Sequence, residues 1–219
     1  MNLASRSKST LITLIVCAIS GIISGFMYKD LSNDYDGYYA CHFVCSEDLS
    51  TALFSLSPGI VFGLLFSITS ISVNIKDRYF GIFRALGSIV AYIIGSTVIW
   101  FIAWWIAYFA FFIFSLVFLG FSLPGLLVAG LIAGFFGGGA LWITTMVVSR
   151  FWKTAAGINI STGMWTAIVG ALSGVVFFFS MGRDFFSSDM SLVSLMNRCV
   201  VFMIWQGAVG SALSISINK

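Results

Sequence analysis

Long apolar runs are the feature that most constrains how this chain folds. Five blocks with few or no charges stand out, at about 10–28, 51–75, 80–148, 163–181 and 193–215. A helix needs roughly 20 apolar residues to cross the hydrocarbon of a bilayer. These runs are apolar on all sides, whereas the strands of a transmembrane barrel alternate apolar and polar residues. The sequence therefore predicts an all-α fold, a polytopic bundle of transmembrane helices.

Composition argues against a soluble domain. Hydrophobic residues make up 59% of the chain and charged residues 9%, whereas a soluble domain carries about 25% charged residues. The net charge of +3 gives no basis for nucleic-acid binding. No polar segment is long enough to form a separate domain, so we expect residues 1–219 to form one integral membrane domain.

The N-terminal segment has the order of a secretory signal, with basic residues before an apolar run. The run from Leu11 to Tyr28 is longer than the apolar part of a typical signal, and no A-x-A-like cleavage site follows it. We therefore expect an uncleaved first transmembrane helix.

The block at 80–148 holds either two or three crossings, and charge decides between them. Lys and Arg near span ends favour the cytoplasm. Two crossings give six spans with both termini cytoplasmic, and eight of the eleven basic residues then lie inside. Three crossings give seven spans and a split of seven to four. We expect six spans, with an outer loop at 29–50 and spans at about 10–28, 51–75, 84–106, 125–148, 163–181 and 193–215.

The third helix of the six-span arrangement is long. Continued from Arg84 to Leu119, it would measure about 54 Å at 1.5 Å per residue, against roughly 30 Å of hydrocarbon. This helix must tilt, extend beyond the membrane or bend at the outer surface. The path of residues 104–123 therefore stays open.

Glycine recurs at four-residue spacing inside the apolar runs. Residues i and i+4 share a helix face, and small side chains let two helix backbones approach closely in lipid. We expect these glycines to pack helices, with a glycine-lined pathway as the alternative. The set comprises Gly21, Gly25, Gly59, Gly63, Gly87, Gly95, Gly130, Gly134, Gly138, Gly170 and Gly174.

Two prolines and a faint repeat add detail to this bundle. Proline fits the first turn of a helix, where its missing N–H costs nothing. Pro58 and Pro124 are therefore expected to begin helices at the outer face. Six spans in this order form three helical hairpins with similar small-residue segments, and a threefold repeat is the weaker of two interpretations because glycine is common in membrane helices.

The first outer loop is the most polar part of the chain and holds Cys41 and Cys45. Outside a bacterial inner membrane the compartment is oxidising, so a local disulfide is the leading interpretation. A zinc site that adds His42 and a carboxylate, or free thiols, are the alternatives.

Polar residues inside the predicted spans are few. Arg198 lies near the outer end of the last span, where it either extends outward toward Asp184 or Asp189 or faces the bundle and holds an anion. Gln206 lies near the middle of that span and is expected to hydrogen-bond a neighbouring helix rather than a ligand. Motifs of hydrolases, metalloproteases and phosphate-binding loops do not occur in the sequence. We expect no enzyme activity and no cofactor.

The segments SPGIVFG, LPGLLVAG and WQGAVG resemble, in a general way, those of small six-span inner-membrane proteins of bacteria. This likeness does not assign a family. We expect a bacterial inner-membrane component that contacts the lipid bilayer and packs against itself or a membrane-protein partner. The alternative is a small transporter or channel for a neutral or weakly charged solute, with a polar cavity around Gln206 and Gly137.

Overall fold

A computed structural model describes residues 3–27, 49–74, 81–117, 122–151, 160–184 and 192–217. Six α-helices occupy these ranges, which confirms the all-α class. They are α1 (Leu3–Met27), α2 (Leu49–Asn74), α3 (Ile82–Val117), α4 (Ser122–Phe151), α5 (Ile160–Asp184) and α6 (Leu192–Ile217).

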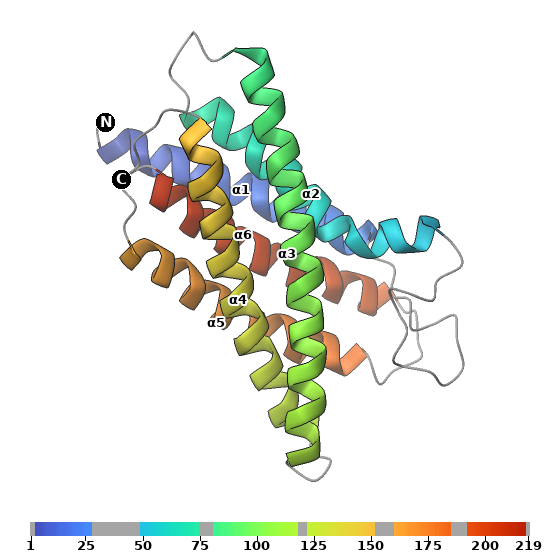
Figure 1. Cartoon of the computed structure of the whole chain (residues 1–219). Helices are drawn as coiled ribbons and strands as arrows, with labels where there is room; N and C mark the ends of the chain where they lie inside the picture. The colour runs from blue at the N-terminus through green and yellow to red at the C-terminus, as the bar shows by residue number, and fades with distance from the viewer. Residues whose placement is uncertain are drawn as a thin grey trace.

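The helices form a closed ring in chain order. Each helix packs against the next one along the chain, and α6 returns to pack against α1. Across the ring, α6 also contacts α2 and α4. The start of α1 and the end of α6 lie close together at one end of the bundle (Figure 1). This arrangement places the two ends of the described chain on the same side.

Hydropathy identifies the chain as a multi-pass membrane protein. Helices α1, α2, α3, α4 and α6 are each long and apolar enough to cross a membrane, and α5 is apolar over Ile160–Val176. Large apolar side chains cover the outside of the bundle, including Phe83 (86% exposed) and Leu116 (65% exposed). Contiguous apolar surface of this kind marks contact with a membrane or a partner.

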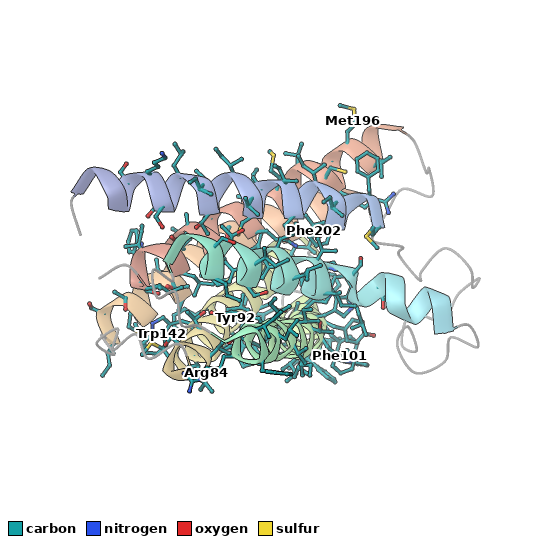
Figure 2. The ribbon with its side chains drawn as sticks, turned by 90° about the horizontal axis from the view of Figure 1, so that it is seen from above. Arg84, Tyr92, Phe101, Trp142, Met196 and Phe202 are labelled. Atoms are coloured by element: carbon teal, nitrogen blue, oxygen red, sulfur yellow. The ribbon has the colours of Figure 1, made fainter. Side chains whose placement is uncertain are left out.

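The longest helix is also an oblique one. Residues Ile82–Val117 form one continuous helix of 36 residues, about 54 Å long. In Figure 1, α3 and α4 cross the direction of α1, α2, α5 and α6 at a steep angle, and Figure 2 shows α1 along its length while α3 is strongly foreshortened. A helix of this length fits within the ~40–45 Å of a whole bilayer when it tilts by about 35–40°. Among the paths expected for 104–123, the structure excludes a bend before Val117, and residues 118–121 lie outside the described residues.

Glycine lets α4 and α5 touch along their backbones. A Cβ placed on Gly130 would lie 2.5 Å from the carbonyl oxygen of Gly174, and one on Gly138 would lie 2.5 Å from that of Thr166. Between them, Gly134 and Gly170 face each other, and a Cβ on either would overlap the other's carbonyl oxygen. Any larger side chain at these positions requires the two helices to separate.

Five other glycines of the expected set lie at the contacts of three further helix pairs. Gly21 and Gly25 of α1 lie against the backbone of α6, and Gly59 and Gly63 of α2 lie against that of α3. Gly95 of α3 faces the side chain of Thr144 on α4.

Gly87 does not pack against another helix, which corrects the expectation for this position. It is exposed, and a Cβ placed on it would have no neighbour within 4 Å. The reason is the position of the first turns of α3, where Ile82 (70% exposed) and Leu86 (53% exposed) also stand clear of the other helices.

The two prolines differ in position. Pro124 lies in the first turn of α4, which begins at Ser122. The expectation for Pro58 is wrong, because α2 begins at Leu49 and Pro58 lies inside it. An internal proline removes one backbone hydrogen bond and bends the helix. At this turn of α2, side chains from neighbouring helices donate hydrogen bonds to backbone carbonyl groups.

Candidate functional site at the Pro58 turn

Gln206 is the polar centre of the bundle. Its side chain is fully buried, and it connects three helices. The hydroxyl group of Ser20 on α1 donates a hydrogen bond to Oε1 of Gln206 at 2.5 Å. The amide nitrogen of Gln206 donates to Oγ of Ser24 at 2.9 Å and to the carbonyl oxygen of Pro58 on α2 at 3.3 Å. Both amide hydrogens and the amide oxygen are thus used within the protein.

Ser20 and Ser24 present their hydroxyl groups to Gln206 because they lie four residues apart on one face of α1. Ser24 also donates to the carbonyl oxygen of Ser20 at 2.8 Å. The adjacent Gly21 and Gly25 bring the backbone of α1 against α6, which places the hydroxyl groups within reach of the amide. We call Gln206, Ser20, Ser24 and the Pro58 carbonyl the Gln206 network.

Helix α3 binds the same turn of α2 from the other side. Nε1 of Trp100 donates to the carbonyl oxygen of Ser55 at 3.1 Å, and Oγ of Ser96 lies 2.7 Å from the carbonyl oxygen of Gly59. Proline lacks the N–H group that would bond to the carbonyl group four residues earlier, that of Phe54. The carbonyl groups of Ser55 and Gly59, on either side of Pro58, accept hydrogen bonds from side chains of α3.

Aromatic side chains fill the interior next to this turn. Trp100 packs against Phe202 and Trp205 of α6, with ring centroids 5.5 Å and 6.2 Å apart. Phe62 of α2 packs against Trp205 at 6.2 Å. Figure 2 shows Phe202 and Tyr92 in the interior of the bundle and Met196 on its outside.

A small cavity remains between these rings. It has a volume of about 30 Å³ and is lined by residues that include Pro58, Gly59, Trp100, Gly137 and Trp205. This volume holds about one water molecule. Gln206, Ser20 and Ser24 are absent from its lining, so the cavity meets the polar network only at Pro58.

The remaining sequence candidates lie elsewhere. Arg198 is partly buried on α6, where its backbone lies against Gly25 of α1. The side chains of Asp184 and Asp189, proposed as its partners, lie outside the part of the chain whose side chains the structure describes. Cys41 and Cys45 also lie outside the described residues.

Sequence reasoning did not identify Ser20, Ser24, Ser96 or Trp100 as partners of this site. The signal for the two serines was present, because Ser20 and Ser24 repeat the four-residue spacing of the glycines next to them. No comparable signal marks Trp100, whose indole reaches α2 only because α2 and α3 are adjacent in the ring.

Hydrogen bonding is the chemistry available at this site. The Gln206 network contains one amide, two hydroxyl groups and a backbone carbonyl, and none of them titrates near neutral pH. Within the described ranges, no three His, Cys, Asp or Glu side chains come together as metal ligands.

Comparisons with protein-family models, with curated proteins and with solved structures found no match.

Proposed function

We propose that this chain is a six-span, non-catalytic component of a bacterial inner membrane that acts by packing against a second copy or another membrane protein. The observation that carries the proposal is the closed ring of helices with an interior filled by aromatic rings, whose central cavity measures about 30 Å³. The proposal treats all six helices as spans and both termini as cytoplasmic.

Two observations support an even number of crossings. The start of α1 and the end of α6 lie at the same end of the bundle (Figure 1). The distribution of Lys and Arg favours that end as the cytoplasmic one, with eight of eleven basic residues inside. α5 then also crosses the membrane, as the fifth of six spans, although its described apolar run is the shortest.

The exposed side of α3 is where a protein partner would pack. Of the apolar stretch of α3, 22% is buried inside the chain, compared with 61% for that of α6. Val90, Ile94 and Val98 lie at four-residue spacing on its surface, and each is about half exposed. Residues at this spacing form one continuous strip along the helix.

The alternative, a small transporter, predicts a polar cavity around Gln206 and Gly137. One observation favours it, because an internal proline at mid-helix is a feature of the broken helices of transporters. Against it, the cavity beside Gly137 is apolar and small, and Gln206 is fully hydrogen-bonded.

The proposal is tested with protein extracted in mild detergent after crosslinking in the membrane. We expect a stoichiometric crosslinked species, either a dimer or a complex with one partner. Ile94→Trp should reduce it several-fold, whereas Leu172→Trp, at a 63% exposed site on α5, should leave it unchanged.

A second measurement separates packing from transport. Vesicles that contain the protein are exposed to an osmotic gradient of glycerol or urea, and we expect the same permeability as protein-free vesicles. Faster solute entry, or a protein that remains a monomer without a crosslinked partner, contradicts the proposal.

A further inference from the structure

Pro58 divides α2 into two parts that are joined less firmly than the turns of a regular helix. Helix α2 begins at Leu49 and carries Pro58 inside it, and a proline lacks the N–H group that continues the hydrogen-bond ladder. Residues 49–57 precede this break, and we call them the outer segment of α2. In both views the start of α2 extends beyond the neighbouring end of α1 (Figures 1 and 2). The break thus separates a projecting segment from the body of the helix.

The part of α2 after Pro58 is fixed to α3. A Cβ placed on Gly59 would lie 2.6 Å from Cα of Thr97, so the two backbones are in direct contact. Further along α2, the ring of Phe66 packs against that of Tyr92, with ring centroids 5.3 Å apart. This part of the helix cannot shift unless α2 separates from α3.

Trp100 of α3 holds the outer segment from across the break. Its indole N–H group donates a hydrogen bond to the carbonyl oxygen of Ser55 at 3.1 Å, on the other side of Pro58. The indole ring itself is buried and packs against Phe202 and Trp205 of α6. A firmly packed donor therefore fastens the outer segment to the interior.

Ser57 opposes this position of the outer segment. Its side chain is 2% exposed, and its hydroxyl group has no hydrogen-bond partner among the described residues. A buried hydroxyl group without a partner is unfavourable, and exposure to water removes the penalty. Directly before the proline there is thus one group that favours the observed position, the Trp100 indole, and one that disfavours it.

We propose that the outer segment of α2 is a hinged strap that swings at Pro58 between two positions. In the closed position, which the structure shows, Trp100 holds the Ser55 carbonyl. In the open position that hydrogen bond is broken, and water hydrates the hydroxyl group of Ser57 and the carbonyl group of Ser55. The opposing contributions of Trp100 and Ser57 bring the two positions close in free energy, as a two-state element requires.

The strap is coupled to the interior of the bundle. Pro58, the hinge, and Trp100, the residue that holds the strap, both line the cavity of about 30 Å³, so opening changes two walls of that cavity. The side on which α2 begins is the outer face in the orientation proposed above. The strap goes beyond the proposed function, and only the assignment of its face rests on that proposal.

The experiment measures how fast a cysteine at position 55 reacts with a charged methanethiosulfonate. The side chain of Ser55 is 2% exposed, so Ser55→Cys is protected while the strap is closed. The substitution keeps the backbone carbonyl group that Trp100 binds. The reagent is added to either face of vesicles that contain the protein. Serine or alanine replaces the native cysteines of the chain, which are Cys17, Cys41, Cys45 and Cys199.

We expect two variants to shift this rate in opposite directions. Trp100→Phe removes the N–H donor and should speed the reaction several-fold. Ser57→Ala removes the unpaired hydroxyl group and should slow it several-fold. The control is Val201→Cys on α6, another site that is 2% exposed, which should react at one rate in all three backgrounds.

Rates at position 55 that stay unchanged, or that move in the same direction in both variants, overturn the strap. A Val201→Cys rate that rises together with that of Ser55→Cys also overturns it, because the whole bundle has then loosened. If Trp100→Phe does not fold, Ser57→Ala decides alone, and an unchanged rate contradicts the proposal.

Failure of the proposed function gives a different result. With the opposite orientation, the same order of rates appears with the reagent on the other face of the membrane. Without a packing partner, the crosslinked species is absent while the rates at position 55 are unaffected.

Discussion

At the scale of single residues, Gln206 shows how a polar side chain is accommodated in the middle of an apolar bundle. An amide in hydrocarbon is unfavourable unless its hydrogen-bonding groups find partners. Here the partners come from two other helices, through Ser20, Ser24 and the carbonyl of Pro58. The side chain therefore specifies which faces of α1, α2 and α6 meet.

Replacing Gln206 with leucine tests this role. Gln206→Leu keeps a similar volume but removes three contacts between helices, and we expect a loss of about 1–2 kcal/mol in the free energy of unfolding. The measurement is unfolding in mixed detergent micelles. Ser211→Ala is the control, because Ser211 bonds only within α6, to the carbonyl oxygen of Ala208, and should change stability little. A Gln206→Leu protein as stable as the wild type would show that the network adds nothing.

At the scale of helices, glycine decides how close two elements lie. In water, glycine weakens a helix, but in lipid the helical hydrogen bonds have no competing solvent. The cost of glycine then matters less, and the close contact that it permits between α4 and α5 matters more.

Gly134→Ala should therefore destabilise the protein. The added methyl group would overlap the carbonyl oxygen of Gly170, and overpacking of this kind costs about 1–3 kcal/mol. Thermal unfolding in detergent is the measurement, and the same alanine substitution at the exposed Gly87 is the control. If both variants unfold at one temperature, the contact between α4 and α5 does not limit stability.

The tilt proposed for α3 leads to a separate prediction about how deep its residues lie in the membrane. If α3 tilts within the bilayer, most of its C-terminal half stays in hydrocarbon and its end reaches only the headgroup layer, although the helix is about 54 Å long. With Cys41 and Cys45 replaced by serine, Phe112→Cys should react slowly with a water-soluble maleimide, while Gly81→Cys, beside the start of α3, should react rapidly in permeabilised vesicles. Rapid reaction at position 112 would indicate a helix that projects into water.

At the scale of the whole molecule, the proposed topology has both chain ends on the cytoplasmic side. It follows from an even number of crossings, and the start of α1 and the end of α6 lie at the same end of the bundle (Figure 1). The same arrangement places the end of α4 with the chain ends, next to the basic residues Arg150 and Lys153 of the sequence.

Reporter fusions provide the corresponding test. In a bacterial host, a reporter that works only in the cytoplasm should be active when fused after Ser149 and after Lys219. A third fusion after Asp184, at the end of α5, should be inactive. Seven spans would reverse the result at Ser149, because an additional crossing would then precede it.

Much of the architecture follows from the sequence because apolar length and charge are local properties. A run of about 20 apolar residues is stable as a helix in lipid whatever surrounds it, so the membrane class and the approximate helices could be derived without a structure. Glycine spacing likewise indicates close packing, because faces repeat every four residues.

Only the tertiary structure decided which faces meet. It joined Gln206 to two serines and a proline carbonyl, left Gly87 without a neighbour, placed Pro58 inside α2 and inclined α3 against the other helices. These outcomes depend on the positions of neighbouring helices, and in lipid most helix faces are similarly apolar. Pairing is then selected by backbone approach and by a few hydrogen bonds between segments far apart in the chain.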